Sequence, residues 1–287
     1  MSTHPAITLS HVSKVYANGT VALQDMNLAI NQSQFISLVG PSGCGKSTVL
    51  RLIAGLGKMS SGTIQWGGPL QLPSQVAKPA LSSKSASLAF VFQDAALMPW
   101  ATVIENVRLP LKLAGVSAKQ VDTAVREAIA LVGLQGFEQS YPRELSGGMK
   151  MRVSIARSLV TQPQLLLMDE PFGALDEITR SRLNADLLEL WSQKLWTVVF
   201  VTHNIYEAVY LSNRVIVMAA RPGRVVADVA IAAPYPRTEE FRTSSLYNKY
   251  CREVSAHLSA AVTELSAATR PATSNRRIPD LPNSSVA

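Results

Sequence analysis

FISLVGPSGCGKS, residues Phe35–Ser47, is the segment from which the rest of this 287-residue chain is best interpreted. Its first five residues form a short apolar run, which predicts a buried strand. The remainder fits G-x-x-x-x-G-K-[ST] without a mismatch, and a helical run over residues 47–56 follows. A glycine-rich turn between a strand and a helix N-terminus directs backbone N–H groups and the helix dipole at phosphate oxygens. The sequence therefore predicts a phosphate-binding loop at Gly40–Ser47, called the P-loop below.

Apolar, β-branched runs recur after this loop and alternate with segments of helical period. The runs at 165–169, 198–202 and 215–218 predict further strands. A helix is predicted from Ser117 to about Gly133. Another opens near Asp176, because Leu183, Leu187 and Trp191 fall on one face of a helix. Such alternation is typical of an α/β fold with a largely parallel sheet. The segment 67–87 is rich in Pro, Gly and Ser and predicts connecting loops.

Composition limits the class of protein. Lys and Arg number 27 against 20 Asp and Glu, and the net charge of +7 suits an anionic partner such as a nucleotide, a nucleic acid or a lipid surface. A modest excess of solvated basic side chains explains the same charge. No apolar run approaches the length of a membrane helix, which needs about 18 consecutive apolar residues. Cys44 and Cys251 make no disulfide framework, which favours a reducing compartment. We therefore expect a soluble, cytosolic, globular chain.

A second element of the predicted phosphate site follows the strand at 165–169. Asp169 stands at the carboxyl end of this strand, where open sheets bind ligands, and would orient Mg²⁺. Glu170 comes one residue later, and alternation along the strand would turn it to a different surface. A carboxylate there can take a proton from attacking water, the role of a general base. Many strands end in acids at the solvent edge, so this pattern carries weight only together with the P-loop.

Leu145–Met149, LSGGM, opens a helical run that continues through Arg157. A hydroxyl and two glycines at a helix start can bind an anion, although a plain Ser N-cap gives the same pattern. In order along the chain, the P-loop, this segment and the Asp169-Glu170 strand resemble the ATP-binding cassette (ABC) ATPase family. The resemblance covers most of residues 6–230.

The resemblance implies a role for individual residues. Tyr16 matches an aromatic that stacks on adenine, Gln93 a glutamine that touches Mg²⁺ and water, and His203 the switch histidine. Asn204 departs from the family, which usually has Asp there. The implied catalytic residues are Glu170, His203 and Gln93, and the implied Mg²⁺ ligands are Ser47, Gln93 and Asp169. The residues implied to bind ATP are Tyr16, Gly40, Pro41, Ser42, Gly43, Cys44, Gly45, Lys46, Ser47, Thr48, Ser146, Gly147, Gly148 and Asp176.

The family also implies an architecture. We expect an α/β P-loop NTPase core with a mostly parallel sheet, an N-terminal antiparallel β part, and a helical subdomain that carries the LSGG segment. The ABC ATPase domain would span residues 6–230, with the helical subdomain at about 94–160. Residues 231–287 would form a C-terminal helical extension and a flexible tail.

The expected partners follow from the same resemblance. Two cassettes would pair head to tail, each ATP lying between the P-loop of one and the Ser146 region of the other. A homodimer is the natural form, and a heterodimer stays open. Membrane-spanning permease subunits would be direct partners at the cytoplasmic face of the inner membrane, and a periplasmic or extracellular solute-binding protein an indirect one. No nucleic acid is expected.

Three segments are similar to cassettes of nitrate, sulfonate and taurine importers: Leu97–Trp100, Met149, and the Ala220–Arg224 run ARPGR. Thiamine-precursor importers look much the same. The apolar segment 95–100 would belong to a groove that receives a permease helix, with buried core as the alternative interpretation.

The same motifs also occur in ABC ATPases that do not act in import. A soluble, non-transport ABC ATPase could act in cofactor assembly or on nucleic acid. The segment 48–144 leaves no room for the long coiled coil of DNA-repair members, and a single P-loop argues against the two-cassette translation type. Glu170 and His203 argue against a regulatory nucleotide sensor that lacks turnover.

Overall fold

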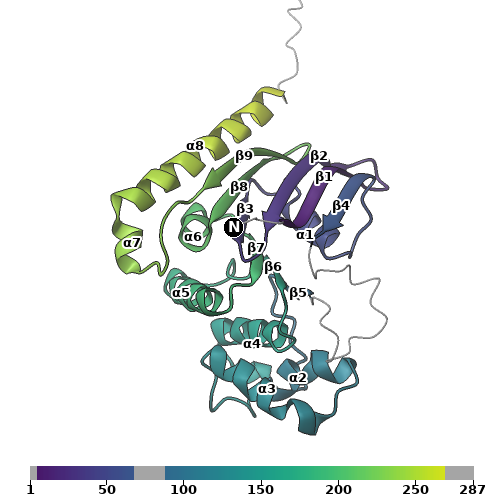
Figure 1. The fold of residues 1–287 in the computed structure, drawn as a ribbon, viewed down its shortest axis with the longest axis vertical. Helices are drawn as coiled ribbons and strands as arrows, with labels where there is room; N and C mark the ends of the chain where they lie inside the picture. The colour runs from purple at the N-terminus through teal and green to yellow at the C-terminus, as the bar shows by residue number, and fades with distance from the viewer. Residues whose placement is uncertain (1–4, 68–87, 269–287) are drawn as a thin grey trace, which may run out of the picture.

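The computed structural model describes residues 5–67 and 88–268. A six-stranded sheet forms the centre of the molecule, in the order β5-β6-β7-β3-β8-β9 (Figure 1). All neighbours in this sheet pair in parallel except β8 and β9. The strands are β3 Phe35–Val39, β5 Leu88–Val91, β6 Leu165–Asp169, β7 Thr197–Val201, β8 Arg214–Ala219 and β9 Arg224–Ala230. The predicted mostly parallel sheet is confirmed, and each predicted strand lies within one residue of its observed bounds.

A separate three-stranded antiparallel sheet lies at the N-terminal side, as predicted. Its order is β2-β1-β4, and its strands are β1 Pro5–Val15, β2 Val21–Asn31 and β4 Ser61–Trp66. Buried side chains of β1 and β2 pack with α1 (Lys46–Ile53) in one hydrophobic cluster that also includes one face of the central sheet. This cluster supports the P-loop helix from both sheets.

The other helices are α2 Val103–Leu113, α3 Ala118–Leu131, α4 Gly147–Leu159, α5 Glu177–Lys194, α6 Ile205–Leu211, α7 Glu239–Thr243 and α8 Ser245–Ala268, with a short 3₁₀ turn at Pro142–Glu144. Helices α4, α5, α6 and α8 pack against the central sheet, whereas α2 and α3 pack on α4. In Figure 1, α2, α3 and α4 form a group at one end of the molecule. This is the predicted helical part, and α4 begins within the LSGG segment.

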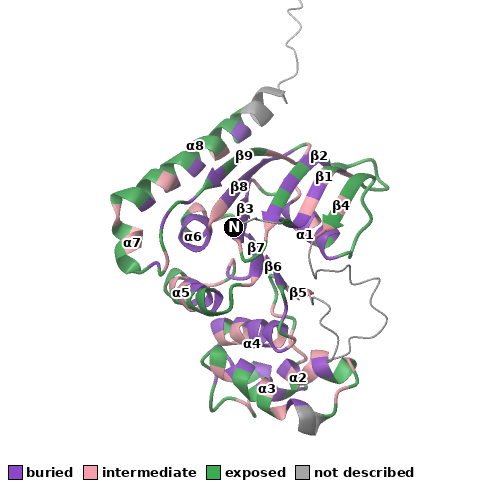
Figure 2. Cartoon of the chain, viewed as in Figure 1, coloured by how far each residue is buried: buried purple, intermediate pink, exposed green. Residues whose placement is uncertain are grey.

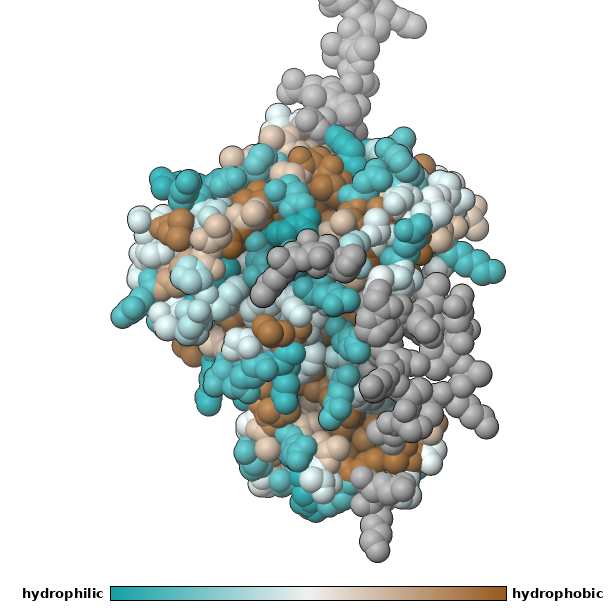
Figure 3. Space-filling model, viewed as in Figure 1, coloured by the Kyte–Doolittle hydropathy of each residue, from teal (hydrophilic) through white to brown (hydrophobic). Residues whose placement is uncertain are grey.

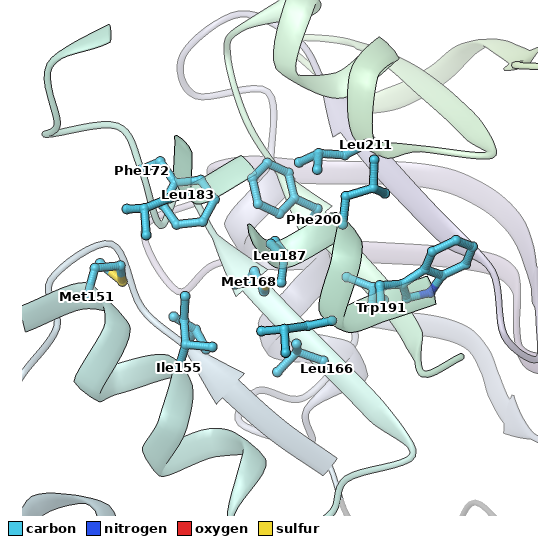
Figure 4. Close-up of a cluster of buried hydrophobic side chains, with 14 of the residues drawn as sticks. Met151, Ile155, Leu166, Met168, Phe172, Leu183, Leu187, Trp191, Phe200 and Leu211 are labelled. Carbon is cyan, nitrogen blue, oxygen red and sulfur yellow. The ribbon is translucent and has the colours of Figure 1, made fainter. Parts of the chain in front are cut away.

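The central strands are buried on both faces, which explains their continuous apolar runs. β3 and β7 are buried at every position, as the purple strands of Figure 2 show. In β6, Leu166 and Met168 pack with Leu187 and Trp191 of α5 in the cluster drawn in Figure 4. Leu165 and Leu167 point to the opposite cluster, beneath α1. The predicted stripe of α5 is therefore the stripe that covers the sheet.

The C-terminal extension is folded onto the central sheet. Helix α8 contacts β8, β9 and α6. Arg237, in the connection before α7, is buried, and its Nη1 donates hydrogen bonds of 2.9 Å to the carbonyl oxygens of Val209, Tyr210 and Ser212. These carbonyls lie at the C-terminal end of α6, where a helix leaves its acceptors without partners. The extension thus completes the end of α6.

Two predictions of the sequence analysis fall outside the described residues: the loops of 68–87 and the flexible tail of 269–287. The domain boundary at residue 230 coincides with the end of β9 and stays a prediction. Among helices of the described ranges, none combines the length and the apolar character that crossing a membrane requires.

Candidate active site

The P-loop connects β3 to α1 at the carboxyl edge of the central sheet. Gly45 is the N-cap residue of α1 and has a φ of 92°, in the left-handed region that glycine adopts without a Cβ clash. The side chain of Cys44 is fully buried, and burial raises the pKa of its thiol. The buried thiol fills space against the loop, which agrees with a packing role for this residue.

The side chain of Lys46 folds back over the first residues of the P-loop. Its side chain is 6% exposed, and Nζ donates to the carbonyl oxygens of Gly40 at 2.8 Å and Pro41 at 3.3 Å. The same Nζ lies 4.0 Å from Glu170 Oε1. The ammonium group is therefore held between the P-loop and the acidic end of β6.

Ser47 and Asp169, predicted as Mg²⁺ ligands from segments far apart in sequence, are in direct contact. The Ser47 hydroxyl donates to Asp169 Oδ1 at 2.8 Å. Burial raises the pKa of Asp169, and the adjacent Glu170 carboxylate adds to this rise. Hydroxyl and carboxylate oxygens are donors that Mg²⁺ prefers, and a partly buried carboxylate gains from a nearby cation. The donor set fits the ion.

Glu170 is oriented by its backbone in a way that the sequence analysis did not foresee. Strand β6 ends at Asp169, and Glu170 has a φ of 46°, in the left-handed region. The expectation that strand alternation would orient this carboxylate is therefore wrong, because the strand geometry has already ended. Its Oε2 lies 3.0 Å from Nδ1 of His203, which follows β7. The predicted base and the predicted switch histidine are hydrogen-bonded partners.

Gln93 approaches the same carboxylate from the neighbouring strand β5. A Cβ built on Gly173 would lie 3.7 Å from Glu170 Oε2 and 3.8 Å from Gln93 Nε2. Both side chains therefore line the same small space beside Gly173. All three predicted catalytic residues, Glu170, His203 and Gln93, come together at adjacent strand ends.

Tyr16 lies beside the first turn of α1. Its hydroxyl is 3.2 Å from Thr48 Oγ1, and the residue is 40% exposed. The Lys14 ammonium lies 5.0 Å from the centre of the Tyr16 ring. An exposed aromatic face next to the P-loop helix is compatible with base stacking, which stays a prediction.

Ser146 caps α4 in the helical part of the molecule (Figure 1). Its hydroxyl accepts a hydrogen bond from Met149 N at 3.3 Å, and both Ser146 and Gly147 are exposed. Gly148 is buried where α4 meets α5, since a Cβ there would lie 2.7 Å from Thr179 Cγ2. Within the described part of the chain, no hydrogen bond or ion pair joins Ser146–Gly148 to the P-loop. One chain alone does not unite these two predicted ATP-binding segments.

Comparison with known proteins decides the family. The ABC transporter family matches residues 23–173. The aliphatic sulfonates import ATP-binding protein SsuB of Bacillus cereus is 44% identical over 236 residues, which cover 81% of this chain and 89% of that protein. The chain belongs to the ABC transporter family. It is an ABC ATPase cassette.

Solved structures agree with this assignment. A dimeric ATP-binding cassette in a post-hydrolysis state, bound to ADP and Pi, has a TM-score of 0.67 and 31% identity, covering 79% of this chain and 100% of that one. The cassette cbiO1 of Clostridium perfringens, part of the ABC transporter complex cbiONQ, has a TM-score of 0.70 and 25% identity, covering 91% and 99%. The prediction of the family and of its fold is confirmed.

Two capping residues of this ABC cassette stand at the edge of the site. Asp176 caps α5 by accepting from Thr179 N at 3.0 Å, which lowers the pKa of its carboxyl. Asn204 caps α6, accepting from the backbone N–H groups of Tyr206 at 2.9 Å and Glu207 at 3.2 Å. The departure from Asp at position 204 therefore preserves the helix cap next to His203.

Sequence reasoning missed the residues that hold the Gln93 loop. Arg157 of α4 donates to the carbonyl oxygens of Ala95 at 2.7 Å and Ala96 at 2.8 Å. The fully buried Asn106 of α2 accepts from Met98 N at 2.8 Å and donates to the carbonyl oxygens of Met98, Ala101 and Thr102. An Arg or Asn on a helix is usually solvated, so neither residue gave a signal in the sequence.

Proposed function

We propose that this ABC cassette hydrolyses ATP to drive uptake of a small organic or inorganic anion, of the sulfonate, taurine or nitrate type, through separate membrane-spanning subunits. The observation that carries the hydrolytic part is the convergence of Lys46, His203 and the Ser47–Asp169 pair on Glu170. The sulfonate type is favoured by the 44% identity to SsuB, whose name describes aliphatic sulfonate import.

The P-loop and the following Thr48 are assigned to the phosphates. Lys46 can exchange its contacts with loop carbonyls for phosphate oxygens, which are stronger acceptors because they are charged. Ser47, Gln93 and Asp169 are the side chains that would hold Mg²⁺, whose charge offsets that of the phosphates when it is bound. Tyr16, beside α1, is assigned to the adenine base.

Hydrolysis is assigned to the carboxylate at the end of β6. Glu170 accepts a proton from the attacking water, which is the work of a general base. His203 holds Oε2 of this carboxylate through its Nδ1 contact and leaves the far side of its ring for the γ-phosphate. Gln93 shares the space beside Gly173 and can orient the water.

Dimerisation completes the site. The exposed cap at Ser146 and Gly147 offers a hydroxyl and a helix N-terminus that the P-loop of its own chain does not use. In a head-to-tail pair, this cap would meet ATP bound by the partner's P-loop. We assign the partner as a second copy of this chain, in keeping with the dimeric form of a similar cassette.

The surface of the helical part is assigned to the permease. Trp100 is 75% exposed, so buried core does not explain this residue, whereas Leu97 is partly buried against the main hydrophobic cluster. Hydrophobic residues gather on the lower, helical end of the molecule in Figure 3. A permease helix docked here would hold the cassette at the cytoplasmic face of the membrane and act on the loop that starts at Gln93. A solute-binding protein on the opposite side would deliver the solute.

A complementation experiment tests this function. Cells lacking the cassette would be supplied with the wild-type chain or with the matched variant Glu170→Gln, then grown on an alkanesulfonate or taurine as sulfur source, or on nitrate as nitrogen source. We expect the wild type, and not the variant, to restore growth on one of these sources, with sulfate and ammonium as controls. Equal growth of all strains on every source would contradict the importer and favour the soluble, non-transport alternative.

A further inference from the structure

The ARPGR turn, residues 220–224, leads from the end of β8 into the first residue of β9 and packs against the P-loop and the start of β2. Gly223 joins β2 through two backbone hydrogen bonds: its N–H donates to Ala22 O at 3.2 Å, and its carbonyl accepts from Gln24 N at 2.9 Å. The turn therefore occupies a fixed position relative to the antiparallel sheet, although it belongs to the central one.

Gly223 leaves no room for a side chain. A Cβ built there would lie 2.3 Å from the carbonyl oxygen of Cys44 and 2.5 Å from that of Ala22. Both neighbours are backbone atoms, which cannot rotate away as a side-chain tip can. Gly223 does not adopt a left-handed φ, so the close approach to the P-loop, and not backbone conformation, is what requires glycine here.

Two glycines of the P-loop, Gly40 and Gly45, also leave no room for a side chain against β8 and β2. A Cβ on Gly40 would lie 2.6 Å from Met218 O of β8, and one on Gly45 would lie 2.8 Å from Ala22 O. The loop, the start of β2 and the end of β8 thus meet at backbone contact distance. Because close-packed backbone transmits displacement, a shift of the turn would shift the loop.

We propose that Gly223 is a positioning residue for nucleoside triphosphate binding. The ARPGR turn sets the position of the P-loop relative to the end of β8 and its distance from the start of β2. Tyr16 precedes this strand, with its N–H bonded to Thr20 O at 2.9 Å just before β2 begins. The turn therefore also fixes the separation between the phosphate-binding loop and the predicted base-stacking ring. This inference rests on the proposed nucleotide site, and it gives the ARPGR segment a physical role.

The variant Gly223→Ala tests the proposal, with Gly57→Ala as its matched control. Gly57 has an ordinary φ, and a Cβ there would meet only Leu52 Cδ2, at 3.5 Å. We expect the Kd for MgATP to rise about 10- to 100-fold in Gly223→Ala, the loss that follows when roughly one hydrogen bond to a charged phosphate is broken, and to stay unchanged in Gly57→Ala. Wild-type affinity in a folded Gly223→Ala variant overturns the proposal. Absence of MgATP binding by the wild type overturns the proposed function instead.

Amide hydrogen exchange of the wild-type chain keeps the test valid if Gly223→Ala does not fold. MgATP should slow exchange of the Gln24 and Gly223 amides, whose hydrogen bonds join the turn to β2. The Gly67 amide, bonded to Ala6 O at 2.9 Å, serves as a reference on the same sheet. Protection free energies report local opening, so a turn coupled to the loop must respond to its ligand. Equal exchange of Gln24 and Gly223 with and without MgATP contradicts the coupling.

Discussion

Glu170 combines a left-handed backbone with two polar neighbours, Lys46 and His203. Left-handed geometry costs a residue with a side chain roughly 1–2 kcal/mol, and such strain is tolerated where the surroundings determine it. Here the Glu170 N–H is bonded to Val201 O at 2.9 Å, and the side chain reaches toward Lys46 and His203. These contacts offset the cost of the left-handed conformation. The result is a carboxylate in a position that the strand geometry of β6 alone would not give.

The substitution Glu170→Gln should separate binding from turnover. Gln keeps the size and the hydrogen-bonding reach of Glu but cannot accept the proton of the attacking water. We expect MgATP binding to persist and steady-state ATPase activity to fall by about 10²–10⁴-fold, the usual effect of losing a general base. Filter binding and phosphate release measure the two quantities. Near-normal phosphate release would contradict the role of Glu170.

Asn204 should act through the stability of α6 and not through the charge at this position. Asn204→Ala removes the acceptor for two N–H groups of the helix and should lower the free energy of unfolding by about 1 kcal/mol. Asn204→Asp keeps the acceptor and should leave stability unchanged or raise it by ~0.5 kcal/mol through the helix dipole. Urea unfolding of the three proteins provides the comparison. A loss of stability in Asn204→Asp as large as in Asn204→Ala would show that Asn204 does not stabilise α6 by capping it.

At the scale of elements, the loop from Gln93 to Ala101 is attached by hydrogen bonds to helices α4 and α2 of the helical part. Arg157 of α4 holds its first half and Asn106 of α2 holds its second half through backbone carbonyls. The same α4 begins at the Ser146 cap. Motion of this cap therefore reaches the Gln93 loop through one rigid helix of 13 residues.

Trp100 and Leu97 should differ although they lie in the same loop. Trp100→Ala removes an exposed ring and should leave thermal stability and MgATP binding nearly unchanged while weakening permease binding by ~2 kcal/mol, as loss of an aromatic anchor does. Leu97→Ala removes contacts with the core and should lower stability by about 1–2 kcal/mol, less than for a fully buried leucine. Calorimetry and co-purification with the membrane subunits measure the two effects. A large fall in the melting temperature of Trp100→Ala with intact co-purification would contradict the interface.

The elements predicted from sequence were those with a strong local pattern. The runs of β3, β6 and β7 are buried on both faces, and the Leu183–Trp191 stripe of α5 faces one sheet, so period and composition were sufficient. Strand β9 was not predicted, because an edge strand with mixed burial resembles a loop. The geometry at Glu170 depends on a φ value, and the clamps of Arg157 and Asn106 depend on tertiary contacts. Neither leaves a periodic trace in the sequence.

At the scale of the whole molecule, the two predicted halves of an ATP site lie on different parts of the chain. The P-loop stands beside the antiparallel sheet, while the Ser146 cap lies at the start of α4 in the helical group (Figure 1). Each chain therefore offers one P-loop and one cap that do not meet within it. The proposed head-to-tail pair of chains would bring each P-loop against the cap of the other chain.

Mixed dimers should reveal this arrangement. Lys46→Ala and Ser146→Arg should each abolish ATP trapping in the homodimer, because each removes or blocks phosphate contacts worth about 1.5–3 kcal/mol. In a heterodimer of the two variants, one composite site carries both changes and the other carries neither. We expect close to one ATP trapped per heterodimer, measured with labelled nucleotide after isolation through two different tags. Trapping no greater than in either parent, with heterodimers shown to form, would contradict the pairing.

The central position of β3 also determines when this protein can acquire its fold during synthesis. Phe35 pairs with Val198, and Val39 pairs with Val217, so the strand before the P-loop lacks both neighbours until most of the chain has left the ribosome. At about 5–20 residues per second, the wait is on the order of ten seconds. During this time an apolar strand and a glycine-rich loop stay unpaired, and nascent-chain chaperones have their opportunity to bind. Translation speed across the segment up to β8 therefore sets how long this strand and loop stay unpaired.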